Sequence, residues 1–91
     1  VLIDIRTPAE WAQTGVAKGA VPLDMTSATF QNDFAMQFGA NPGKKIALIC
    51  RSGNRSSQLA AMMEASGLTK IVDVTGGTSQ WIADGLPVEK K

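Results

Sequence analysis

The 91-residue sequence contains no histidine and no tyrosine, and it has one cysteine, Cys50. Without histidine, neither a Cys–His nor a Ser–His–Asp catalytic arrangement can form within the chain, and a zinc site of the cysteine–histidine type is excluded. A single cysteine also excludes an internal disulfide and a Cys-x-x-Cys redox pair. If Cys50 is activated, backbone dipoles and nearby cations must activate it, because no imidazole base exists.

Long apolar runs and a strong charge of either sign are also missing. No apolar stretch approaches the ~20 residues of a membrane-spanning helix, and the formal net charge is +1. We therefore expect neither nucleic acid nor a membrane as a partner. We expect a soluble monomer with a single domain over residues 1–91, in the cytoplasm or the bacterial periplasm. The absence of a signal peptide and of a starting methionine is expected of a mature or trimmed form.

The residues that are present place Cys50 where a buried strand ends and a helix begins. Residues 46–49 form an unbroken apolar run, which is typical of a strand buried on both faces. From residue 56 onward, apolar side chains recur at helical spacing. The short segment between them, residues 51–55, is polar and contains two arginines and one glycine.

Such a strand-to-helix junction favours an anion, because N–H groups of the loop and of the first helical turn point into one concavity. Arg51 and Arg55 add positive charge there. A free cysteine has a pKa of ~8.5, and cysteines in such places have pKa values of ~3.5–7.5, so we expect Cys50 to be a reactive thiolate. The alternative is a small, inert, buried side chain. The polar residues after Cys50 favour the reactive interpretation.

Strands alternate with helices along the rest of the chain. Apolar runs predict strands at residues 1–5, 20–23, 46–49 and 71–74, with Pro22 restricting the second to an edge or end position. Capping residues predict helices that begin at Thr7, with Glu10 closing a capping box, at Thr26 or Ser27, at Ser56 or Ser57, and at Thr78 or Ser79. Residues 88–91 are expected to be a polar tail.

This alternation predicts an α/β domain with a mostly parallel central sheet and helices on both faces. Ligand sites in such sheets lie at the carboxyl ends of the strands. Three loops follow such ends, at residues 4–6, 50–55 and 74–77, so we expect them to converge. Gly76 and Gly77 are expected to let the chain pass close to the loop of Cys50.

Several other side chains are interpreted as structural. Phe30, Phe34 and Phe38 are spaced by four and predict one core-facing helical stripe. Trp11 and Trp81 are expected in the core rather than in contact with a substrate. For Asp4 and Arg6, we expect either pairing with each other or support of the Cys50 loop by hydrogen bonds.

The segment after the central strand resembles the active-site loop of rhodanese-type sulfurtransferases: Cys50-Arg51-Ser52-Gly53-Asn54-Arg55-Ser56. Further motifs of that family follow the same order along the chain: Asp4-Ile5-Arg6, Glu10-Trp11 with Gly15 and Gly19-Ala20, and Gly76-Gly77 with Trp81, Gly85 and Leu86-Pro87-Val88. The resemblance covers essentially the whole chain. It implies a rhodanese-like three-layer domain with a mostly parallel, four- to five-stranded central sheet.

The chain departs from the family pattern in two places. Val16 stands where many members have histidine, which affects a local contact outside the loop. The strand and helix that usually precede the Asp-x-Arg motif are missing, which leaves two alternatives. The chain is either a small single-domain member of the periplasmic type or a piece of a longer protein.

The resemblance implies transfer of sulfane sulfur without metal, cofactor or general base. The Cys50 thiolate would take the outer sulfur of a small anionic donor, thiosulfate or a persulfide, and pass it to cyanide, a thiol or a protein acceptor. Backbone N–H groups of residues 51–56 would hold the persulfide. The side chains expected to bind substrate are Arg51, Ser52, Asn54, Arg55 and Ser56, with Gly53 allowing the sharp turn and Asp4 and Arg6 supporting the loop.

Alternatives remain for residues and function. Arg51 is alternatively a solvated surface charge, and Arg55 a structural ion pair, for instance with Asp4. A phosphatase of this fold type would need Cys-x-x-x-x-x-Arg, and Arg55 is one residue too early for that spacing. A non-catalytic binding module of this type would typically lack the loop cysteine. A relay of persulfide to a protein acceptor keeps the chemistry and changes only the partner.

Overall fold

The computed structural model describes residues 1–52, 54–67 and 70–90. The elements in chain order are β1 (Leu2–Asp4), α1 (Pro8–Thr14), β2 (Val16–Ala17), β3 (Val21–Pro22), α2 (Phe30–Ala40), β4 (Ile46–Ile49), α3 (Asn54–Ala65), β5 (Ile71–Asp73), α4 (Gly77–Ala83) and β6 (Val88–Glu89). None of the helices in these ranges is long and apolar enough to cross a membrane.

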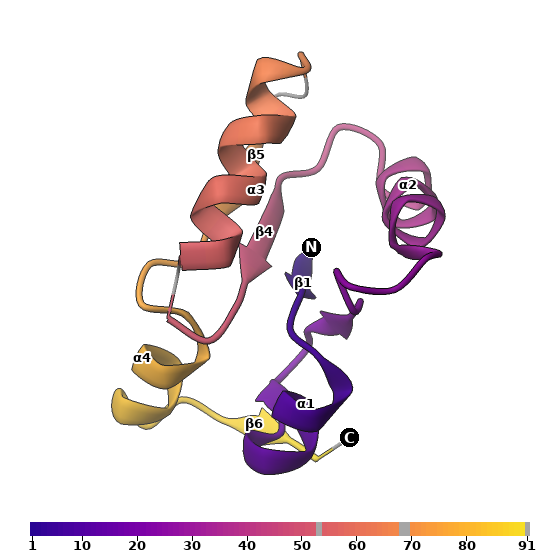
Figure 1. The fold of residues 1–91 in the computed structure, drawn as a ribbon. Helices are drawn as coiled ribbons and strands as arrows, with labels where there is room; N and C mark the ends of the chain where they lie inside the picture. The colour runs from indigo at the N-terminus through magenta and orange to yellow at the C-terminus, as the bar shows by residue number, and fades with distance from the viewer. Residues whose placement is uncertain (53, 68–69, 91) are drawn as a thin grey trace.

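The central sheet has four strands in the order β3-β1-β4-β5, and every pair is parallel. This arrangement confirms the predicted α/β architecture. β3 lies at an edge, as Pro22 requires, because proline cannot donate a ladder hydrogen bond. In the register of β1 and β4, Asp4 lies opposite Ile49, so both strands end at the same edge of the sheet. The loops that follow these two strands are therefore neighbours (Figure 1).

The core lies on both faces of the sheet. On one face, Phe30 and Phe34 of α2 are buried, with ring centroids 5.9 Å apart, and Phe38 packs beside them. These contacts confirm the predicted phenylalanine stripe. On the other face a smaller cluster includes Ile49 and the partly buried Trp81. Because both faces are covered, β4 needs apolar residues at nearly every position.

Helix α1 begins as the sequence predicts. The Thr7 hydroxyl accepts from the Glu10 N–H and the Glu10 carboxylate accepts from the Thr7 N–H, which completes a capping box. Pro8 occupies the first turn, and Gly15 ends the helix with a φ of 74°.

Three predicted helix starts are wrong. α2 begins at Phe30 with Thr29 as its N-cap, because the Ser27 hydroxyl accepts from the Thr29 N–H in the preceding turn. α3 begins at Asn54, so neither Ser56 nor Ser57 caps it. α4 begins at Gly77 with Gly76 as its N-cap, ahead of Thr78 and Ser79. Only at α4 do tertiary contacts accompany the earlier start, because the Thr78 and Ser79 N–H groups donate to the carbonyl oxygens of Cys50 and Arg51.

The predicted polar tail is also wrong for residues 88–89. Val88 and Glu89 pair antiparallel with Ala17 and Val16, forming the two-stranded sheet β2-β6. Gly15 makes this approach possible, because a Cβ there would lie 2.6 Å from the Glu89 carbonyl oxygen. Two-residue strands have no readable periodicity, so sequence alone could not place them.

Candidate active site

Cys50 lies directly after β4, and its side chain is buried, with 1% exposure. The Ser56 N–H donates to Cys50 Sγ at 3.5 Å, and the Ser56 hydroxyl lies 3.4 Å from the same sulfur. Since α3 begins at Asn54, Ser56 belongs to the first helical turn, whose N–H groups have no partner within the helix. The sulfur therefore receives a first-turn N–H, as the strand-to-helix junction predicts.

The rest of the loop is mostly solvent-facing. The side chains of Arg51, Ser52 and Asn54 are exposed, and Arg55 is intermediate. The interpretation of Gly53 as a turn residue lies outside the described residues. The sulfur is thus buried, whereas the side chains of Arg51, Ser52 and Asn54 face solvent.

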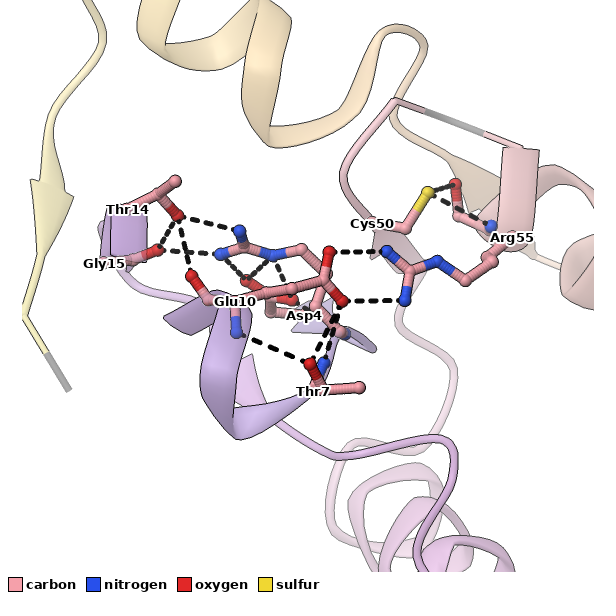
Figure 2. Close-up of polar contacts among 9 residues, drawn as sticks. Asp4, Thr7, Glu10, Thr14, Gly15, Cys50 and Arg55 are labelled. Carbon is pink, nitrogen blue, oxygen red and sulfur yellow. Dashed lines mark hydrogen bonds and ion pairs between the residues drawn. The ribbon is translucent and has the colours of Figure 1, made fainter. Parts of the chain in front are cut away.

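The Arg55 guanidinium is held by Glu10 of α1, as Figure 2 shows. Nη1 and Nη2 donate to the two carboxylate oxygens at 2.8 and 2.7 Å. The suggested partner Asp4 is wrong, because the Asp4 carboxylate pairs with Arg6. The hydrogen bonds from Arg55 lower the pKa of Glu10 from 4.5 to about 2, against the opposing effect of burial. The carboxylate raises the pKa of Arg55 in turn.

Asp4 and Arg6 form a second pair, which is fully buried at 0% and 1% exposure. The Arg6 Nε and Nη2 donate to the Asp4 carboxylate at 2.8–3.1 Å. The remaining donors of Arg6 reach the Thr14 hydroxyl and the Gly15 carbonyl oxygen at the end of α1. Of the two expectations for these residues, mutual pairing is confirmed. No described hydrogen bond of Arg6 reaches residues 50–56, so direct support of the loop by Arg6 is not observed among the described residues.

The described hydrogen bonds between the start of α4 and the loop are made by backbone groups. The Thr78 N–H donates to the Cys50 carbonyl oxygen at 2.7 Å, and the Ser79 N–H donates to the Arg51 carbonyl oxygen at 3.0 Å. A Cβ at Gly77 would lie 2.5 Å from the Cys50 carbonyl oxygen, closer than real Cβ contacts occur. The predicted close passage of the chain at Gly77 is confirmed.

The three predicted loops do converge. The Ile5 N–H donates to the Ile49 carbonyl oxygen at 3.0 Å, and the Val74 N–H donates to the Leu48 carbonyl oxygen at 2.8 Å. Sequence analysis missed Glu10 as a member of this site, because its spacing from Thr7 explains it fully as a capping residue. In the described ranges, no group of three or more cysteine or carboxylate side chains is placed to hold a metal ion.

Comparisons with known proteins agree with this geometry. Residues 1–84 match the model of the rhodanese-like domain. The chain is 33% identical over 88 residues to a sulfurtransferase of Allochromatium vinosum, covering 97% of this chain and 77% of that protein. It is 34% identical over 94 residues to thiosulfate sulfurtransferase 16, chloroplastic, of Arabidopsis thaliana, covering 96% and 78%.

A solved structure gives the same result for the fold. The crystal structure of a rhodanese-related protein from Thermoplasma volcanium superposes with a TM-score of 0.79 at 30% identity, covering 100% of this chain and 84% of that chain. A match over nearly the whole sequence, a matching fold and a cysteine at the end of the central strand lead to one conclusion: this chain belongs to the rhodanese-like domain family.

Proposed function

We propose that the chain is a sulfurtransferase that carries sulfane sulfur as a persulfide on Cys50. Sulfur transfer in general is supported by the family and by the names of the relatives. The observation that carries the proposal is the hydrogen bond from the Ser56 N–H to Cys50 Sγ. An N–H aimed at a sulfur stabilises its thiolate, and the thiolate is the nucleophile.

The proposed reaction has two steps and needs no net oxidant or reductant. In the first, the Cys50 thiolate attacks the outer sulfur of thiosulfate or of a persulfide. A new S–S bond forms on Cys50, and the old one breaks to release sulfite or a thiolate. In the second step, cyanide or a thiolate attacks the outer sulfur on Cys50, and the S–S bond to Cys50 breaks. The product is thiocyanate or a new persulfide. The Cys50 thiolate returns to its starting state.

The loop side chains have distinct proposed roles. Exposed Arg51 attracts the anionic donor, and the side chains of Ser52 and Asn54 offer further donors at the surface. Ser56 holds the sulfur. Arg55 contributes less to donor binding than a free arginine would, because both terminal nitrogens are already bound to Glu10.

The physiological acceptor in this proposal is a thiol, of small molecule or of protein, with cyanide as its laboratory substitute. We expect no phosphatase activity, because Ser56 stands where such an enzyme needs arginine and Arg55 is tied to Glu10.

The test is intact-mass spectrometry after treatment with thiosulfate or a polysulfide. We expect one added sulfur atom that cyanide removes, and no addition in Cys50→Ser. Ser56→Ala is the control: it removes the hydroxyl beside the sulfur but keeps the backbone N–H and Cys50, so this variant should still take up sulfur. Absence of added mass with every sulfane donor, in a folded protein, would overturn the proposed function.

A further inference from the structure

An apolar groove lies between α2 and α3, on one face of the sheet, and has no role in the steps above. Its volume is about 560 Å³, and residues of both helices line it. Two of them, Phe30 and Phe34, belong to the buried core. The only polar side chains among the described lining residues are those of Gln31 and Ser66, and both are neutral. The groove is therefore a hydrophobic surface that carries no charge of its own.

The groove is open to solvent. Met62, which lines it from α3, is 67% exposed, and Ala35 lines it from α2 and is exposed as well. Leu59 and Met63 also line it and are only partly buried. Contiguous exposed apolar patches, unlike scattered single side chains, mark interaction sites, and flexible methionine side chains adapt to the shape of a partner. We therefore expect another molecule to cover the groove.

The length and width of the groove suit a short helix. Its lining residues extend from Phe30 to Gly39 on α2 and from Leu59 to Ser66 on α3. At a rise of about 1.5 Å per residue, these stretches are roughly 10–14 Å long, or two to three helical turns. A helix is about 10–12 Å wide and can contact both walls, whereas a single acyl chain would leave one wall in water. Amphipathic helices bind such grooves through apolar side chains at positions i, i+3 or i+4, and i+7.

One end of the groove adjoins a cluster of three lysines, Lys44, Lys45 and Lys70. Both helices end on this side of the sheet (Figure 1), and the lysines lie in the segments that lead from α2 into β4 and from α3 into β5. The two segments are in contact. Lys70 Nζ donates to the Gly43 carbonyl oxygen at 3.0 Å, and the Ile46 N–H donates to the Lys70 carbonyl oxygen at 2.9 Å. The three lysines therefore form one cluster.

Backbone hydrogen bonds connect this lysine cluster to the groove. The Lys44 N–H donates to the Asn41 carbonyl oxygen at 3.2 Å, and the Asn41 N–H donates at 3.3 Å to the carbonyl oxygen of Phe38, a lining residue. All three lysines are exposed, and within residues 1–52, 54–67 and 70–90 none of them forms an ion pair. Glu64 is the one carboxylate in the last turn of either helix or in the described parts of the two segments. Positive charge therefore remains in excess at this end.

We propose that the groove between α2 and α3 is a docking site for an amphipathic helix of a protein partner, with acidic residues at one end of that helix. The apolar stripe of the helix would cover the groove, and its carboxylates would lie against the lysine cluster. In such interfaces the buried apolar side chains supply most of the affinity, whereas charges at the rim set orientation and the rate of association. The inference does not use Cys50, so it stands or fails independently of sulfur transfer.

The first test titrates a synthetic peptide into the protein while backbone amide resonances are followed by NMR. The peptide has about 15 residues, the length at which an isolated helix becomes marginally stable. It is alanine-based, with leucine at positions i, i+3, i+4 and i+7 and glutamate in its first turn, and its matched peptide has glutamine in place of glutamate. We expect saturable shifts at Ala35, Leu59 and Met62. Their absence up to about 1 mM peptide, the weak end of specific binding, would overturn the proposal.

Variants in the groove test where the peptide binds. Met62→Glu should weaken binding about tenfold or more, because it places an unpaired charge in the interface. Met36→Glu is the matched control, since Met36 is 71% exposed on α2 but does not line the groove, and binding should not change. Ala35→Glu repeats the test from the other wall if Met62→Glu loses its fold. Equal affinities in the groove variants and in Met36→Glu would overturn the docking site.

A lysine variant tests the charge of the partner. Lys45→Gln should weaken binding of the glutamate peptide about two- to fivefold, the range of an exposed ion pair, and leave the glutamine peptide unchanged. Lys18→Gln is the control, because Lys18 is exposed beside the sheet β2-β6, where its backbone N–H donates to the Pro87 carbonyl oxygen. An equal loss for both peptides in Lys45→Gln would overturn the assignment of an acidic partner.

Two further measurements distinguish other occupants. Sedimentation velocity of the protein alone, at the concentration used for NMR, should show a monomer. A dimer that Met62→Glu dissociates would assign the groove to a second copy of this chain and overturn the proposal. Decanoate, an acyl chain with one carboxylate, should bind the groove more weakly than the glutamate peptide. Tighter binding of decanoate would assign the groove to a small amphipathic acid instead.

Discussion

The loop that carries Cys50 is supported from two sides by different means. From α1, the Glu10 carboxylate holds the Arg55 side chain through two charged hydrogen bonds. From α4, backbone N–H groups hold the carbonyl oxygens of Cys50 and Arg51, and Gly77 permits the close approach. The support from α1 is an ion pair between side chains. The support from α4 is a set of backbone hydrogen bonds, which form because Gly77 has no side chain to block the approach.

The difference between these supports concerns their strength and their sensitivity to conditions. The Arg55–Glu10 pair is partly exposed, at 36% and 19%, so water and salt weaken it. The α4 contacts carry no net charge, so neither salt nor pH near neutrality should change them. We therefore expect α4 to fix the position of the loop and α1 to adjust its charge.

The largest expected effect tests the anchor beneath α1. Arg6→Met removes the buried partner of Asp4 and the bonds to Thr14 and Gly15. Breaking one side of a buried pair costs about 3–5 kcal/mol, so the free energy of unfolding should fall by that amount. Chemical denaturation measures it. If the free energy of unfolding falls by only about 1 kcal/mol, the upper range of exposed ion pairs, then burial does not make the Asp4–Arg6 pair more stabilising than the Arg55–Glu10 pair.

Gly77→Ala should have the next largest effect. The new Cβ would meet the Cys50 and Arg51 carbonyl groups at 2.5–2.7 Å, at a φ of +60°. Left-handed backbone and overpacking together should cost about 2–4 kcal/mol and displace the loop. We expect lower thermal stability and slower sulfur uptake by Cys50.

Gly85→Ala is the matched control for this substitution. Gly85 has a φ of +77°, but a Cβ at this position would meet no atom within 4 Å, so the alanine bears only the conformational cost. If the two variants lose equal stability and Gly77→Ala keeps full sulfur uptake, the close approach of α4 does not position the loop.

Glu10→Gln should have a smaller effect that depends on salt. The free energy of unfolding should fall by about 1 kcal/mol or less at low salt, the range of exposed pairs. The loss should shrink at 1 M salt, where the Debye length is ~3 Å. Denaturant unfolding at both salt concentrations measures this. Glu64→Gln, at an exposed residue without a described ion pair, is the control. If the loss of stability is the same at both salt concentrations, Glu10 stabilises the protein through the capping box of α1 rather than through its ion pair with Arg55.

The smallest effect is the pH dependence of the same pair. The pKa of Glu10 is lowered from 4.5 to about 2 in the folded protein. A carboxylate with a depressed pKa stabilises the fold fully above its unfolded pKa and loses that contribution as the pH falls through the folded value. The stability difference between the native chain and Glu10→Gln should therefore persist above pH 4.5 and diminish toward pH 2. NMR titration of the Glu10 carboxyl group should show a pKa below the ordinary 4.5, and an ordinary pKa would contradict the pairing.

Local features of the sequence determined much of the fold and the position of Cys50, the proposed nucleophile, at the end of β4. The apolar run Ile46–Ile49 predicted β4 with its bounds, since a strand buried on both faces needs apolar residues throughout. The spacing of Thr7 and Glu10 predicted the start of α1, and the spacing of the phenylalanines predicted the core face of α2. These signals are readable because each lies within a single helix or strand.

Only the tertiary structure decided which distant groups meet. The partner of Arg55 is Glu10, 45 residues earlier, and the two carboxylates near Arg55 could not be ranked from sequence because the choice depends on how α1 packs. The pairing of β2 with β6 and the groove between α2 and α3 likewise depend on long-range packing. The sequence thus placed Cys50 at the end of a buried strand, whereas packing decided which charged groups and cavities lie near it. Electrostatic fields and cavities depend on groups that are distant in the chain and are brought together only by the fold.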